Sequence, residues 1–236
     1  MVLDPRWTAT VDDGLKNAEW DKYDETIKRE VAGYNQRLGS TTGYTQVDWK
    51  LLKAVLWVES GGPTSREWNK KVMQIGNPGD AAYGVLKRGA EGSQMVMSTQ
   101  LWEDIRKKDI SDPTLNIRAA VAYVFTRLGK FTEASIEDPS DAFDHTYIVA
   151  SGDSLWSIAH KVGTTQLSLK ARNPGAGKAI HPKQKLVYRR ASMQLTVSGW
   201  RDFTTANIAT YYNGGGDAQY AAKLNYVLDL FKKVKR

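Results

Sequence analysis

Hydrophobic residues in the first quarter of the chain recur at helical spacing and predict two helices that pack in a core. The first pattern runs from Asp13 to Gly39. Its apolar face carries Trp20, Tyr23, Ile27, Val31, Tyr34 and Leu38. The second helix is expected over 49–60, because Asp48 can cap its start and Gly61 follows its end. Apolar side chains occupy almost every face of this second helix, so we expect the helix to be buried.

One glutamate, Glu59, lies on the continuation of the apolar stripe of this second helix, one turn beyond Val55 and Leu56. Low dielectric and the negative end of the helix dipole both disfavour a carboxylate there and raise its pKa. A carboxyl group with a raised pKa suits a general acid that works near neutral pH. The same residue can also pair with an Arg or Lys, or end a helix in solvent. Other motifs in the sequence are needed to distinguish these roles.

The middle of the chain alternates between a loop and a core helix. The run 72–80, VMQIGNPGD, is interrupted by glycine and proline and predicts an irregular loop whose backbone can approach a ligand, or an ordinary surface loop. Asp112 followed by Pro113 predicts the start of a buried helix that ends at Gly129. The acidic stretch 132–144 reads as a linker.

From Tyr147 the pattern changes to a compact strand–helix–helix–strand unit. Strands are expected at 147–149 and 186–188, with one short helix capped by Asp153 or Ser154 and a second over 167–172. The segment 193–236 is expected to be helical again. Its final helix follows Asp217 and presents one apolar stripe, formed by Tyr220, Leu224, Val227, Phe231 and Val234.

Composition narrows the functional classes. The 236 residues carry a net charge of +7, which favours an anionic partner such as nucleic acid, an acidic membrane or the bacterial wall. No basic stripe with interleaved aromatics is present, so no nucleic acid partner is expected. With no cysteine and three scattered histidines, the sequence predicts no disulfide, no metal site and no cofactor. No window reaches transmembrane length, so no membrane insertion is expected.

The small unit resembles a LysM module, a repeat that binds peptidoglycan and chitin. The matching positions are Tyr147, Val149, Gly152, Asp153, Leu155, Ile158, Ala159, Leu169, Asn173, Pro174, Ile180, Gln184 and Leu186. Lys183 stands where the family usually has glycine, a departure expected to affect a turn and not the fold. The resemblance implies a glycan-binding site formed by Gly152, Asp153, Ser154, Leu155, Pro174 and Ile180.

The flanking parts resemble the goose-type lysozyme and soluble lytic transglycosylase superfamily. The matching pieces, in the family's order, are Glu59-Ser60-Gly61, Val72-Met73-Gln74-Ile75-Gly76, Asn116-Ile117-Arg118 and Tyr211-Tyr212-Asn213-Gly214-Gly215. Val72, Tyr211 and the insertion 76–80 depart from the family pattern and affect the expected substrate subsites, not the acid. The expected fold class is mainly α: a lysozyme-like helical catalytic domain of an α+β superfamily, with a small inserted βααβ LysM domain. The expected boundaries are 1–143, 145–191 and 192–236.

This second resemblance implies a peptidoglycan lytic transglycosylase that cleaves the MurNAc-β-1,4-GlcNAc bond and leaves 1,6-anhydroMurNAc ends. Glu59 is then the single general acid and base, because the substrate supplies its own nucleophile. The implied substrate-binding residues are Ser60, Met73, Gln74, Tyr212 and Asn213. The alternative is a lysozyme that hydrolyses the same bond, with Asp80 or Glu91 as the second carboxylate. A further alternative is a non-catalytic wall-binding protein.

Delivery and partners follow from the same resemblance. The implied partner is the peptidoglycan glycan strand, joined by a phage-tail or type VI secretion component or an immunity protein. The first twenty residues lack the apolar core and cleavage site of a signal peptide. We therefore expect a bacteriolytic protein made in the cytoplasm that reaches the periplasmic wall by a non-Sec route, or one whose leader has been removed.

Overall fold

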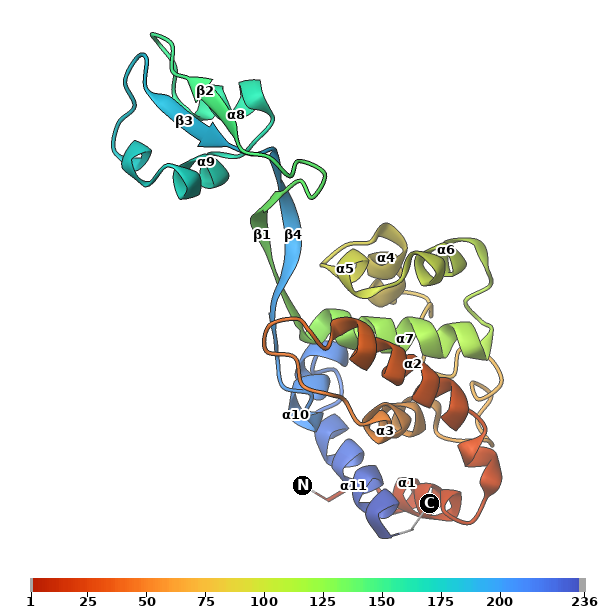
Figure 1. Cartoon of the computed structure of the whole chain (residues 1–236). Coiled ribbons are helices and arrows are strands. Elements are labelled where there is room, and N and C mark those ends of the chain that lie inside the picture. The colour runs from red at the N-terminus through yellow and green to blue at the C-terminus, as the bar shows by residue number, and fades with distance from the viewer. Residues whose placement is uncertain (1, 234–236) are drawn as a thin grey trace. The chain divides into compact units, whose positions relative to one another are not determined.

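A computed structural model describes residues 2–233 (Figure 1). Contacts divide the chain into two units, a larger one that extends up to Phe131 and resumes at Val197, and a smaller one over Thr132–Thr196. The chain thus leaves the larger unit once and returns to it. These limits lie outside the expected 145 and 191, because the residues just before and after the LysM-like segment fold with the smaller unit.

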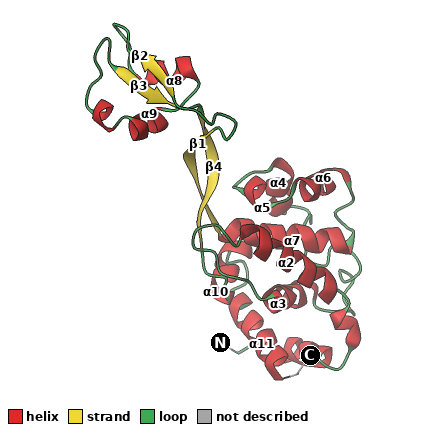
Figure 2. Ribbon diagram, in the orientation of Figure 1, coloured by secondary structure: helices red, strands yellow, loops and turns green. Residues whose placement is uncertain are grey.

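The larger unit is helical (Figure 2). Its elements are α1 Pro5–Gly14, the 3-10 turn η1 Ala18–Asp21, α2 Asp24–Leu38, α3 Trp49–Ser60, α4 Ala81–Arg88, α5 Ser93–Val96, α6 Thr99–Lys107, α7 Pro113–Leu128, α10 Thr205–Asn207, the π-helical turn η3 Ile208–Tyr212 and α11 Tyr220–Lys233. None of the helices within residues 2–233 combines the length and the hydrophobicity that a membrane span requires.

Helix α3 is the buried centre of this unit and lies against α2 and α11. Its predicted bounds are confirmed, since Asp48 accepts a hydrogen bond from the Lys50 N–H at the start and Gly61 ends it with φ +68°. The next residue, Gly62, has φ +87°, and a Cβ there would lie 2.0 Å from the Trp20 ring. Only glycine therefore lets the chain turn sharply past this tryptophan. The turn holds the last residues of α3 against the core.

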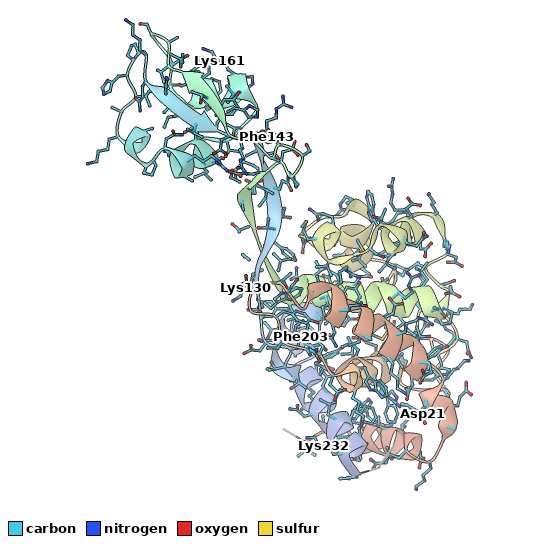
Figure 3. All side chains as sticks on the ribbon, viewed as in Figure 1. Asp21, Lys130, Phe143, Lys161, Phe203 and Lys232 are labelled. Atoms are coloured by element: carbon cyan, nitrogen blue, oxygen red, sulfur yellow. The ribbon has the colours of Figure 1, made fainter. Side chains whose placement is uncertain are left out.

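Helix α7 is the second buried helix and packs against α2, α4, α5, α6 and η3. Asp112 caps it through the Leu115 N–H, and Pro113 opens it, as the sequence predicts. An aromatic cluster covers its C-terminal end. Phe125 stacks on Tyr34 and contacts Phe203, which is labelled in Figure 3.

Three sequence predictions, for the larger unit and for the segments that connect it to the smaller one, are wrong. The pattern 13–39 is not one helix, because the chain turns through η1 and only Asp24–Leu38 forms α2. The segment 193–200 is not helical but belongs to a strand, β4 Ala191–Trp200. Part of the expected linker is also a strand, β1 Gly129–Glu137, which pairs with β4. β1 and β4 form because they pair with each other, about sixty positions apart in the sequence, although their local sequences favour a linker and a helix.

The smaller unit has the predicted βααβ order. It contains β2 His145–Ile148, α8 Leu155–Val162, α9 Gln166–Arg172, the 3-10 turn η2 Pro174–Gly177 and β3 Lys185–Tyr188. β2 and β3 are antiparallel, with Tyr147 opposite Leu186. A separate core fills the space between sheet and helices and consists of Val149, Ile158, Ala159, Leu169, Ala176 and Leu186.

Charged residues join strand β1 to this small core. Glu137 on β1 accepts hydrogen bonds from the Arg172 guanidinium at 2.6 and 2.7 Å. Arg172 and Arg189 also pair with Asp144 at 2.7 and 2.6 Å. These pairs explain why residues before the LysM-like segment belong to the smaller unit.

Candidate active site

The partly buried Glu59 side chain lines an open pocket of about 150 Å³. Residues from α3, the 73–80 loop, α7 and η3 form this pocket. The lining consists of Glu59, Met73, Gln74, Ile75, Asp80, Ala82, Tyr123, Tyr212 and Asn213. Six of the predicted residues, Glu59, Met73, Gln74, Asp80, Tyr212 and Asn213, therefore meet in one place although up to 154 positions separate them.

Burial raises the pKa of the Glu59 carboxyl to about 7. The hydroxyl of Tyr220 donates a hydrogen bond of 2.6 Å to Glu59 Oε1, which opposes the rise by stabilising the carboxylate. The charges of Asp80 and Asp217 raise the pKa further. Near neutral pH the group is thus poised between its acid and its base form, as a proton carrier must be.

The sequence did not predict that Tyr220 contacts Glu59. The family resemblance points to the Tyr-Asn piece, whereas the hydroxyl bonded to Glu59 comes from the first residue of α11. Tyr220 is 3% exposed, and the sequence assigns it to the apolar stripe of that helix. One sequence signal does point to this contact. A tyrosine on the buried stripe of a helix needs a hydrogen-bond partner for its hydroxyl, and the candidate acid is such a partner.

The loop between α3 and α4 is held in place by the buried amide of Asn116, a residue of one family motif for which the sequence predicted no such role. Asn116, fully buried on α7, accepts from the Met73 N–H at 2.8 Å. Its Nδ2 donates to the carbonyls of Ile75 and Ile110 at 2.9 and 3.0 Å. Two groups of this loop, on Met73 and Ile75, and one on Ile110 before α7 are thereby satisfied at once, so Asn116 fixes the backbone that presents Gln74.

Gln74 itself adopts φ +61°, a left-handed conformation that is uncommon for residues other than glycine. Its Nε2 donates to the Glu59 carbonyl at 3.3 Å, and its Oε1 accepts from Asn77 Nδ2. The side chain therefore bridges the end of α3 and the far part of its own loop. This explains how an irregular loop can place an amide beside the candidate acid.

The two candidate second carboxylates have different surroundings. Asp80 lines the pocket, but its two oxygens accept from the Ala82 and Gly76 N–H groups at 2.8 and 2.7 Å. Glu91 is not among the pocket residues and forms a 2.6 Å ion pair with Arg127. Only Asp80 therefore shares a pocket with Glu59.

The Tyr212 and Asn213 side chains close another wall of the pocket. The Tyr212 hydroxyl donates to the Met73 carbonyl at 3.5 Å, and its ring packs on Tyr123. With its Oδ1 facing the next turn, Asn213 accepts from the Asp217 N–H at 2.9 Å. Ser60, by contrast, is buried and accepts from the Gly62 N–H at 3.1 Å, so its expected place in the pocket is wrong.

In the smaller unit, Asp153 holds together the loop after β2. Its carboxylate accepts from the Ala150 N–H, the Tyr147 hydroxyl and Lys161 Nζ at 2.8, 2.9 and 2.6 Å. The hydrogen bond from Lys161 contributes most to lowering its pKa to about 2. The side chain is only 4% exposed, so it shapes this loop instead of facing solvent.

The other predicted glycan-binding residues border two loops of this unit. Gly152 and Pro174 are exposed, while Leu155 and Ile180 are partly buried against the small core. Ser154 forms a capping box with Ser157 at the start of α8, which decides between the two predicted caps. Lys183 takes φ +70°, so it keeps the left-handed turn at the position where the family usually has glycine.

Comparison with known proteins agrees with this description of the smaller unit. Residues 147–188 match the model of the LysM domain family. A curated relative, "Probable endopeptidase p60" from Listeria grayi, is 45% identical over 56 residues, or 24% of this chain. The chain matches only about a tenth of that relative, 11% of its length. No solved structure matches the chain. The chain thus contains a LysM peptidoglycan-binding domain, which associates it with the cell wall.

Proposed function

We propose that this protein is a peptidoglycan lytic transglycosylase that cleaves the MurNAc-β-1,4-GlcNAc bond, with Glu59 as its only general acid and base. The observation that carries the proposal is the Glu59 carboxyl, raised to a pKa of about 7 in an open pocket and hydrogen-bonded to Tyr220. The family motifs that contribute Glu59, Met73, Gln74, Tyr212 and Asn213 to this pocket support it.

In the proposed reaction, protonated Glu59 gives its proton to the glycosidic oxygen, and the bond from that oxygen to C1 of MurNAc breaks. The resulting Glu59 carboxylate takes the proton of the MurNAc 6-hydroxyl, whose oxygen bonds to C1 and forms the 1,6-anhydro ring. The enzyme ends with the proton it started with, and no water is consumed. A carboxyl group with a pKa near 7 serves both steps, because neither protonation state is strongly favoured.

The smaller unit supports a substrate in the wall. A LysM domain binds peptidoglycan glycan strands. The relative's name is that of an endopeptidase, which supports a proposal that this chain also cleaves the wall. Binding the polymer through one unit raises the concentration of its glycosidic bonds around the other. Delivery to the periplasm by a contractile apparatus, and an immunity protein as partner, remain proposals that rest on resemblance alone.

A second candidate, a lysozyme, is favoured by one observation: Asp80 lines the same pocket as Glu59. A hydrolase needs a second carboxylate to activate water across the sugar ring. Both Asp80 oxygens are already engaged by backbone N–H groups, which fits a residue that holds the loop better than one that accepts a proton from water. We therefore rank transglycosylation first.

The test is digestion of purified sacculi, with muropeptides analysed by mass spectrometry. Products with anhydro ends are expected, whereas reducing ends would replace the proposal by the lysozyme. Glu59→Gln should abolish cleavage and keep binding to sacculi, while Glu103→Gln, a solvent-facing carboxylate on α6, serves as the matched control. Absence of cleavage by the unmodified protein would favour a non-catalytic wall-binding role.

A further inference from the structure

A second hollow, rich in positive charge, opens beside the loop that carries Gln74. Its volume is about 440 Å³. The residues that line it are Arg66, Glu67, Lys70, Lys71, Asn77 and Ser111. Three cationic side chains and one carboxylate give this hollow an excess of positive charge. None of the sequence motifs accounts for it.

The cations of this hollow are largely uncommitted. Arg66 is 92% exposed and contacts Glu67 only through a 3.4 Å pair. Among the described residues, no carboxylate lies within ion-pair distance of Lys70. Asp109 is the other nearby acid: its carboxylate accepts from the Ser111 N–H and hydroxyl at 2.9 and 2.6 Å, stays charged, and is attracted to Lys70 and Lys71 without forming an ion pair with either. Arg66 and Lys70 are exposed, and neither forms a short ion pair, so both side chains can contact an anion from outside.

The hollow and the Glu59 pocket share one wall, the loop 71–77. Gln74 faces the pocket, and its Oε1 accepts from Asn77, which lines the hollow. Lys71 fixes the same loop, since its Nζ donates to the Gly76 carbonyl at 2.7 Å and its carbonyl accepts from the Gln74 N–H at 2.7 Å. A ligand that occupies the pocket can therefore extend around this loop to reach the cations.

We propose that the hollow is a subsite for the carboxylates of the peptide stem attached to the muramoyl residue. The inference rests on the proposed function, because a MurNAc unit in the Glu59 pocket carries its stem on the lactyl group. Stem peptides expose free carboxylates, which Arg and Lys side chains bind by charge-assisted hydrogen bonds. Arg66 and Lys70 are the specificity residues, and Lys71 positions the loop.

Wall phosphopolymers offer the same oxyanion chemistry, and the geometry favours the stem over them. The stem is covalently tied to a sugar in the adjacent pocket, so its carboxylates are presented at a high effective concentration. A separate polymer has no such tether. The stem should therefore be the occupant whenever both are present, and the enzyme should prefer glycan that carries peptides over stripped glycan.

The test compares cleavage of peptide-bearing sacculi with cleavage of glycan strands stripped of peptides by an amidase. In the unmodified protein, kcat/KM should be higher on the peptide-bearing substrate. The double variant Arg66→Gln with Lys70→Gln should reduce this preference roughly fivefold at low salt, and the loss should shrink in high salt because surface charges are screened. The matched control is Arg6→Gln with Lys16→Gln, two equally exposed cations on and next to α1.

Different outcomes test the peptide subsite and the transglycosylase activity. An equal loss on both substrates, or an unchanged preference, overturns the peptide subsite while transglycosylation stands. Failure of the unmodified protein to cleave either substrate overturns both. A third arm uses sacculi stripped of phosphopolymers by hydrofluoric acid. If the effect of the double variant disappears there, the hollow binds phosphate instead of the stem. Retention of the effect in that arm supports the stem.

Discussion

Replacing the Glu59 carboxyl by the neutral amide of Gln should stabilise the protein above neutral pH. Burial favours the protonated form of Glu59 in the folded protein, with a pKa of about 7 against an ordinary 4.5. The folded state therefore binds more protons than the unfolded state between these values, and stability falls as pH rises through the window. The loss of folding stability caused by ionising the buried Glu59 is complete above about pH 7 and absent below about pH 4.5.

The size of the effect follows from the same values. A rise from 4.5 to about 7 corresponds to roughly 3 kcal/mol of unfolding free energy at about 1.4 kcal/mol for each pKa unit. Glu59→Gln removes this penalty and keeps an oxygen that can accept the Tyr220 hydroxyl. We expect a gain approaching about 3 kcal/mol at pH 9, or a melting temperature higher by roughly 6–12 °C, and under about 1 kcal/mol at pH 5.

Calorimetry of both proteins at pH 5 and pH 9 measures this difference. Glu103→Gln again serves as control, because its carboxylate is about half exposed and its stability change should be small at both pH values. An equal change at both pH values for Glu59→Gln, or destabilisation at pH 9, would refute the reasoning that burial holds the carboxyl protonated. Stabilisation combined with loss of cleavage would mark Glu59 as a residue retained for chemistry at the expense of stability.

Three further predictions concern residues around the two sites. Tyr220→Phe removes the hydrogen bond that stabilises the Glu59 carboxylate, so the alkaline limb of the pH–rate profile should move up by roughly one pH unit. Asn116→Leu leaves one buried N–H and two carbonyls without partners, and denaturant unfolding should show a loss of about 3 kcal/mol together with reduced cleavage. The pKa of Asp153 is lowered to about 2. Ionised Asp153 therefore stabilises the folded state above pH 3.8, and this stabilisation is lost as the pH falls toward 2. Asp153→Ala should abolish this acid dependence, read as amide hydrogen exchange across 147–188.

Local sequence determined the elements whose signals are short-range. Helix α3 begins and ends where Asp48 and Gly61 predict, and α7 begins where Asp112 predicts, because caps and glycine act through neighbouring backbone groups. The order of the LysM elements was also readable. The final residue of the predicted apolar stripe, Val234, lies outside the described residues.

Long-range pairing is what the sequence did not provide. The strands β1 and β4 are adjacent only because the chain returns to the larger unit, so their residues read locally as linker and helix. Helix α1 and the short helices α4 to α6 were not predicted at all. Their burial comes from distant partners, such as the aromatic contact between Trp7 and Tyr226.

The candidate site shows the same division. Sequence alone identified Glu59 as an acid on an apolar helix face, because helical periodicity fixes which face a side chain occupies. Tertiary structure decided which groups surround it: Tyr220 and not Tyr212 donates to its carboxylate, Asp80 and not Glu91 shares its pocket, and Asn116 holds the loop of Gln74. Hydrogen bonds and desolvation depend on atoms brought together by folding, so the pKa of Glu59 is a property of the packed core and not of its helix alone.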